Sequence, residues 1–101
     1  MTKIHSIICC CGNGIGSSIL MELNLRKALV KLGRKDVAVG HACLTDIGES
    51  EYDLIVTGEE MIDEVRRFPR VIIMQRLISE QELTEKLKKA FLEDRDVFVI
   101  R

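Results

Sequence analysis

The chain of 101 residues is long enough for one domain, and its 47% hydrophobic residues imply an aliphatic core because only 4% of the residues are aromatic. Its 15 basic and 16 acidic residues give a formal net charge of -1 without a basic stripe, which argues against a nucleic-acid partner. No apolar run approaches the ~18 residues of a membrane span, and no signal-peptide pattern precedes the first apolar run, so we expect a cytoplasmic protein without direct membrane insertion.

The first apolar run, Ile4–Cys11, predicts a buried strand that ends at Gly12. A glycine- and serine-rich segment follows, and we expect a helix over Ser18–Leu32 after it. One face of this helix carries apolar residues at helical spacing: Met21, Leu25, Ala28 and Leu32. Gly33 then provides a helix stop, at a position where a left-handed backbone is favoured.

Two more strands, a loop and a short helix are expected in the middle of the chain. Asp36–Cys43 predicts the second strand, Leu44–Tyr52 a polar loop, and Asp53–Thr57 the third strand. The residues Thr57-Gly-Glu-Glu60 have the spacing of a capping box and predict a short helix. The inner face of that helix would hold Met61, Ile62 and Val65.

The last third of the chain predicts a strand, a helix and a short apolar tail. Arg70–Gln75 is nearly continuously apolar, as in the buried strands of parallel sheets. Ser79-Glu-Gln-Glu82 is a second capping box and opens a helix. The inner face of this helix carries Leu83, Leu87, Ala90 and Phe91. Asp96–Arg101 contains the apolar segment Val97–Ile100, which fits either an extra edge strand or an oligomer contact.

The element order β-α-β-β-α-β-α predicts a single α/β domain over residues 1–101. We expect three layers, with a four-stranded parallel sheet flanked by helices, in a Rossmann-like or low-molecular-weight-phosphatase-like arrangement. Ligands of such sheets bind beyond the carboxyl ends of the strands. Cys11 stands at the carboxyl end of the first strand, so the segment that begins there is the candidate site.

Three of the four cysteines are adjacent: Cys9, Cys10 and Cys11, with Cys43 as the fourth. Neighbouring strand residues point to opposite faces, which makes a poor disulfide framework, and the C-x-x-C spacing of a zinc site is absent, so we expect no metal. We expect Cys9 and Cys10 to be buried structural residues. For Cys43 we favour a buried small hydrophobe over a resolving thiol.

The segment Cys11–Ser18 departs from three familiar glycine-loop patterns. A Walker A loop needs a lysine, and this segment has none. A dinucleotide fingerprint needs a third glycine where Ser17 stands. A cysteine-phosphatase loop needs an arginine six residues after its cysteine, and Ser17 occupies that position as well.

A loop that carries a phosphoryl group on Cys11 fits these residues better. Glycines let successive backbone N–H groups point at an anion, and a helix N-terminus favours negative charge and a thiolate. The expected phosphate-binding residues are Gly12, Asn13, Gly14, Ile15, Gly16, Ser17 and Ser18. An arginine on the transferring group is worth ~10³–10⁵ in rate in GTPase systems, so its absence suits a carrier better than a hydrolase.

The chain resembles the IIB component (EIIB) of the bacterial phosphoenolpyruvate-dependent sugar phosphotransferase system (PTS), first in its ascorbate branch and next in its galactitol branch. The apolar residues 7–10 followed by Cys-Gly-Asn-Gly-x-Gly-Ser-Ser carry the resemblance, which continues more weakly through Cys43, Asp53–Thr57 and Val71–Met74. It implies a four-stranded parallel sheet and a phosphocysteine at Cys11. It also implies a phosphohistidine donor on EIIA, a sugar acceptor bound by the membrane permease EIIC, and no cofactor.

The resemblance thus implies a cytoplasmic sugar phosphotransferase that reaches the inner face of the membrane through EIIC, with the sugar left open. We expect its partner surface to surround the loop, with Ile15 and Met21 as exposed apolar contacts. His5 is expected on the surface, and His41 is expected to be a structural histidine with its hydrogen bonds satisfied. A thiol redox or regulatory domain and a phosphatase-like loop protein stay open as alternatives.

Overall fold

A five-stranded parallel sheet with the order β2-β1-β3-β4-β5 forms the centre of the molecule. The computed structural model describes residues 4–10, 15–76 and 79–101, and for residues 15–18 the backbone only. The strands and α-helices are β1 (Ser6–Cys10), α1 (Ile15–Lys31), β2 (Ala38–Ala42), β3 (Leu54–Gly58), β4 (Arg70–Met74), α2 (Glu80–Leu92) and β5 (Phe98–Ile100). None of the helices in these ranges has the length and hydropathy needed to cross a bilayer.

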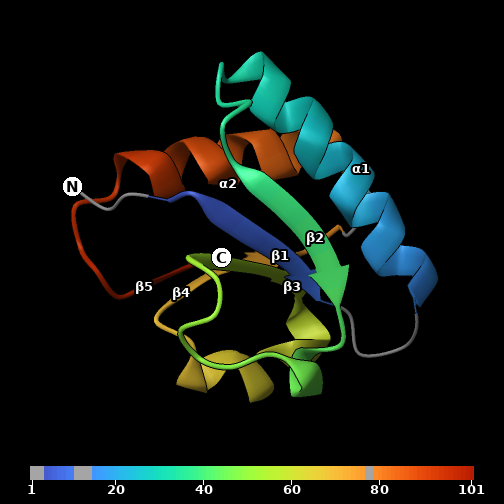
Figure 1. Ribbon diagram of the computed structural model, residues 1–101, viewed down its shortest axis with the longest axis vertical. Helices are drawn as coiled ribbons and strands as arrows, with labels where there is room; N and C mark the ends of the chain where they lie inside the picture. The colour runs from blue at the N-terminus through green and yellow to red at the C-terminus, as the bar shows by residue number, and fades with distance from the viewer. Residues whose placement is uncertain (1–3, 11–14, 77–78) are drawn as a thin grey trace.

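The two faces of the sheet are covered differently. Both α-helices pack on one face, and three short 3-10 helices lie on the other: η1 (Leu44–Asp46), η2 (Glu59–Met61) and η3 (Glu64–Arg67) (Figure 1). Each face has its own apolar cluster, with Met21 and Leu87 in the first and Val65 and Phe68 in the second. The predicted α/β class with three layers is therefore confirmed, and the layer of 3-10 helices is the thin one.

The sheet has five strands, so the prediction of four is wrong. The fifth strand comes from the apolar tail, where Phe98 pairs with Arg70 and Ile100 pairs with Ile72 in parallel register. Phe98 is buried while Val97 and Val99 on either side are exposed. This period of two places a single large side chain in the core, which is a weak sequence signal for a strand.

The α-helix predicted from Thr57-Gly-Glu-Glu60 is replaced by the two short segments η2 and η3. Thr57 belongs to β3, and the residue that precedes η2 is Gly58, which makes no side-chain cap. Pro69 then limits the segment, because the residue before a proline avoids helical backbone, and Phe68 is extended. Val65 nevertheless points into the core as predicted.

Gly33 lies two residues after the end of α1 and has a left-handed backbone, with φ 71°. The predicted helix stop is therefore confirmed. An added Cβ would meet no atom within 4 Å, so a substitution here changes the backbone energy and not the packing.

We expect Gly33→Ala to lower the free energy of unfolding by about 1–2 kcal/mol, because an L-residue with a Cβ is strained in the left-handed region. Gly33→Asn should lose less, because asparagine tolerates this conformation better than alanine. Urea unfolding at 25 °C would measure both variants. An alanine variant as stable as the wild type would contradict this reading of the turn.

Candidate functional site

The strand order places a topological switch point between β1 and β3. The chain leaves β1 toward β2 on one side, whereas β3 is followed by β4 on the other. Open α/β sheets bind ligands outside the carboxyl ends of the strands at such a point. Cys10 is the last residue of β1, and Cys11 is the next residue in the chain.

Part of the predicted loop lies outside the described residues. These positions are Cys11, Gly12, Asn13 and Gly14, together with the side chains of Ile15, Ser17 and Ser18, and Gly16 is described by its backbone alone. Their assignment to phosphate binding therefore stays a prediction. What the structure does describe is the strand before the loop, the helix after it and the neighbouring strand ends.

The helix after the loop offers a positive pole to an anion. The α1 backbone begins at Ile15, at the same edge of the sheet as the end of β1 (Figure 1). The first N–H groups of a helix have no intrahelical acceptor, and the helix dipole adds positive potential there. The first turn of α1 contains no acidic residue that would compete with an anion.

The two cysteines before the loop are buried structural residues, as predicted. Cys9 packs in the cluster beneath the α-helices, and Cys10 packs in the cluster on the opposite face. Burial raises the pKa of the Cys9 thiol far above its usual value, and the neighbouring Cys10 adds to the rise. Cys9 is therefore held as a neutral thiol and is a poor nucleophile.

Cys43 is exposed, so the favoured prediction of a buried residue is wrong. The edge strand β2 ends one residue earlier, at Ala42, and Leu44 turns into the core in its place. The parallel register pairs Cys10 with Ala42. In the sequence, Cys11 follows Cys10 and Cys43 follows Ala42, and these two preceding residues are the last pair between β1 and β2.

A polar cluster fastens α1 to β2 near this edge. Nδ1 of His41 lies 2.7 Å from Oε1 of Glu22, and Nη2 of Arg26 donates to Oε2 of Glu22 at 3.2 Å. The hydrogen bond with His41 and then that from Arg26 hold the pKa of Glu22 below its ordinary value, against the effect of burial. His41 is thus a structural histidine with a partner, as predicted, and His5 is exposed, as predicted.

We expect Glu22→Gln to destabilise the fold at neutral pH by a few tenths to about 1 kcal/mol, since solvent screens the partly exposed partners. A carboxylate with a lowered pKa stabilises the fold above its unfolded pKa of 4.5, and this contribution is lost as the pH falls through the lower folded value. Urea unfolding at pH 7 and near pH 3 would measure the difference between variant and wild type. If the two proteins differed in unfolding free energy by the same amount at both pH values, the proposed stabilisation by the Glu22 carboxylate would be contradicted.

A half-buried carboxylate, that of Glu82, also organises the carboxyl end of β4. Oγ of Ser79 accepts the N–H of Glu82 at 3.1 Å, as the capping box predicts. The Glu82 carboxylate accepts the N–H groups of Gln75 at 2.7 Å and Arg76 at 2.9 Å. Burial would raise the pKa of Glu82, but the hydrogen bonds from Lys86 and from these two N–H groups outweigh it and lower the pKa. Glu82 thus ties the chain that leaves β4 to α2.

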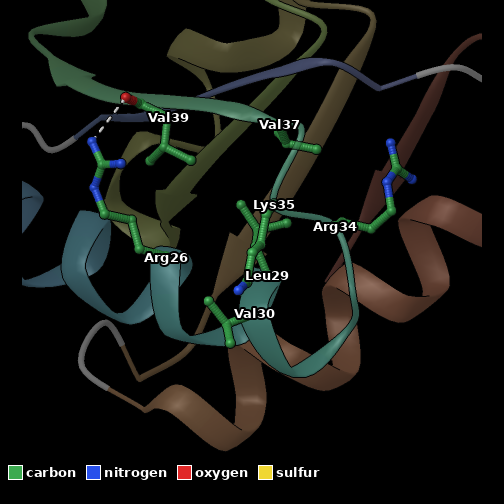
Figure 2. Close-up of a pocket in the computed structure, with 7 residues that line it drawn as sticks. All are labelled: Arg26, Leu29, Val30, Arg34, Lys35, Val37 and Val39. Atoms are coloured by element: carbon green, nitrogen blue, oxygen red, sulfur yellow. Dashed lines mark hydrogen bonds between the residues drawn. The ribbon is translucent and has the colours of Figure 1, made fainter.

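A shallow groove between α1 and β2 lies away from the loop. Its lining residues are Arg26, Leu29, Val30, Arg34, Lys35, Val37 and Val39. Figure 2 shows Arg26 reaching across it from α1 to the carbonyl oxygen of Val39, at 3.3 Å. Its volume of about 140 Å³ is below the ~300–1,000 Å³ of ligand pockets, so we assign it no substrate. No His, Cys, Asp or Glu side chains in the described ranges are grouped to hold a metal ion.

Large aliphatic side chains cover the outer face of α1 directly after the loop. Ile19, Leu20 and Leu23 are 48%, 50% and 49% exposed. Met21, which we expected to be exposed, is fully buried because it belongs to the inner stripe with Leu25. The outer residues 19 and 23 have the same i, i+4 spacing as the inner stripe, and that second stripe was the sequence signal for this surface.

Comparison with known proteins identifies the family. The family model of the PTS lactose/cellobiose-specific IIB subunit matches residues 6–89. The chain therefore belongs to this PTS IIB family, and it is a phosphotransferase-system domain concerned with sugar transport. The family inferred from the loop residues is thus confirmed, although the description of this family model does not name the ascorbate or galactitol branch.

One relative shows the same domain within a longer protein. The PTS system mannitol-specific EIICB component of Streptococcus mutans serotype c is 34% identical over 71 residues. The match covers 69% of this chain and 12% of that relative, so the chain spans a small part of the relative's length.

Proposed function

We propose that this chain is the phosphoryl-carrying EIIB unit of a sugar phosphotransferase system, with Cys11 as the carrier residue. The observation that carries the proposal is the position of Cys11, between the end of β1 at a switch point and the start of α1 four residues later. The positive pole of α1 would favour both the thiolate and the phosphoryl group.

The proposed chemistry consists of two transfers. The Cys11 thiolate attacks the phosphorus of a phosphohistidine on EIIA, so that a P–S bond forms as the P–N bond breaks. A hydroxyl of a sugar held by EIIC then attacks the same phosphorus. The P–S bond breaks, the P–O bond of the sugar phosphate forms, the hydroxyl proton leaves to solvent or to a base of the acceptor complex, and the thiolate returns.

The outer face of α1 supports a protein partner for each transfer. In-line transfer brings the reacting atoms to about 3–3.5 Å, so the partner must cover Cys11 and its surroundings. A standard interface buries about 800 Å² on each side, and the first turns of α1 fall within such an area. Ile19, Leu20 and Leu23 would provide its apolar centre, with Arg26 and Lys27 at its rim. EIIA and EIIC would then bind in turn, since both need the same surface.

Intact-mass measurement after incubation with phosphorylated EIIA tests the proposal. The wild-type chain should gain one phosphoryl group, which peptide mapping should place on Cys11. A reversible disulfide between Cys11 and exposed Cys43 without phosphoryl uptake would favour a redox domain instead. Steady hydrolysis of p-nitrophenyl phosphate would favour a phosphatase.

The most specific part of the proposal is the identity of the acceptor sugar. The loop resemblance favours an ascorbate-type acceptor, while the relative from Streptococcus mutans is named as mannitol-specific. Membranes that contain EIIC should therefore be assayed with ascorbate, galactitol and mannitol as acceptors of the phosphoryl group from this chain. We place the chain at the cytoplasmic face of the membrane during the second transfer, bound through EIIC.

A further inference from the structure

One buried hydroxyl touches the peptide that leads into the candidate loop. Oγ1 of Thr57 donates to the carbonyl oxygen of Cys10 at 2.7 Å, and Thr57 is fully buried. The register of β1 with β3 ends one pair earlier, at Cys9 and Val56. The Thr57 side chain therefore makes a cross-strand bond just beyond the last registered pair, at the switch point itself.

The position of this hydroxyl is unusual for its strand. The three preceding residues of β3, Leu54, Ile55 and Val56, are apolar and buried, and a valine would match the shape of Thr57. Burying a hydroxyl is unfavourable unless it is hydrogen-bonded. The strand thus carries a polar group whose contribution depends on its bond to Cys10.

That bond acts on the peptide unit that joins Cys10 to Cys11. The carbonyl of Cys10 and the nitrogen and Cα of Cys11 share one peptide plane, because the peptide bond is planar. Holding the carbonyl in one direction therefore limits the direction in which the chain enters the loop. A hydrogen bond to the carbonyl also polarises the attached N–H, which strengthens it as a donor.

We propose that Thr57 is a positioning residue, which sets the orientation of the Cys11 backbone through the carbonyl of Cys10. The inference rests on the proposed role of Cys11 as the phosphoryl carrier. Thr57 has no part in the bond changes of either transfer. Its effect is to keep the nucleophile in the orientation that in-line attack requires.

Two variants test the proposal. Thr57→Val removes the hydroxyl and keeps the shape, and Thr57→Ser keeps the hydroxyl and removes the methyl group. We expect the rate of phosphoryl uptake from phosphorylated EIIA to fall on the order of tenfold in Thr57→Val, because small misplacements of reacting groups cost up to about 100-fold. Thr57→Ser should recover most of the rate. Thermal unfolding of both variants shows whether the rates follow stability.

A second readout needs no phosphoryl donor. In a Cys43→Ser background, the rate at which iodoacetamide alkylates Cys11 is measured as a function of pH. Cys9 and Cys10 should not compete for the reagent, because both are buried. We expect the midpoint of this profile to rise in Thr57→Val and to return toward the parent in Thr57→Ser. If the parent takes up no phosphoryl group but these midpoints differ as expected, the positioning role stands and the proposed function fails.

Three results would overturn the inference. Thr57→Val could match the parent in both rate and alkylation profile. Thr57→Ser could lose as much as Thr57→Val, which would show that the methyl group matters and not the hydroxyl. The loss of rate could also follow the loss of thermal stability across both variants, which would reduce Thr57 to an ordinary core residue.

Discussion

Cys11→Ser is expected to take up no phosphoryl group from phosphorylated EIIA, whereas the wild-type chain takes up one. A serine hydroxyl does not ionise near neutral pH, so the variant lacks the thiolate that attacks phosphorus. The substitution changes one atom, in the residue that follows β1 in the chain, and we expect the melting temperature to stay close to that of the wild type. Intact mass after timed incubation measures the uptake.

Cys43→Ser is the matched control for this experiment. Cys43 is an exposed cysteine of the described chain and lies beyond the end of the neighbouring strand. The control should take up the phosphoryl group as the wild type does. Uptake by Cys11→Ser at the wild-type level, or a phosphoryl group that maps to Cys43, would refute the assignment of the carrier residue.

Leu25→Ala is expected to lower the free energy of unfolding by about 2–5 kcal/mol, the range for removing a buried leucine side chain. Leu25 is fully buried in the cluster that joins α1 to the sheet. Small domains have total stabilities of about 5–15 kcal/mol, so this loss is a large share of the whole. Urea unfolding at 25 °C, followed by far-ultraviolet circular dichroism, measures it.

Leu23→Ala is the matched control, two residues away on the same helix. Leu23 is 49% exposed, so its truncation should change stability by only about 0.5 kcal/mol. If Leu23 lies in the centre of the partner interface, the same truncation should weaken EIIA binding by roughly 1–2 kcal/mol, which titration calorimetry would detect. Equal losses of stability in the two variants, or unchanged binding by Leu23→Ala, would contradict the proposed surface.

The sequence predicted the features that depend on local spacing. Leu25 and Ala28 are buried at one helical face, Gly33 has the left-handed backbone of a helix stop, and Ser79 caps α2. The first strand, which ends at Cys10, followed from the same reasoning, because an apolar run that ends before glycines predicts a strand and a turn. These signals need no knowledge of the neighbouring elements.

Features set by distant neighbours could not be predicted in this way. Thr57 fits a capping box locally, but β1 lies beside it in the fold, and its hydroxyl bonds to Cys10 instead. Cys43 looks like a strand residue, yet β2 is an edge strand and ends before it. The exposed face with Leu23 was missed because it has the helical period of the buried face, and periodicity alone cannot say which of two apolar faces the core takes.

The short strand β5 also protects the sheet from joining with other molecules. Without it, the apolar strand β4 (Arg70–Met74) would present unpaired backbone groups along one edge. Long apolar edges of this kind are templates for aggregation. β5 covers that edge with three residues only, Phe98–Ile100, and so leaves too short a strand for further pairing. The apolar tail thus lowers the tendency of β4 to pair with a strand of another molecule.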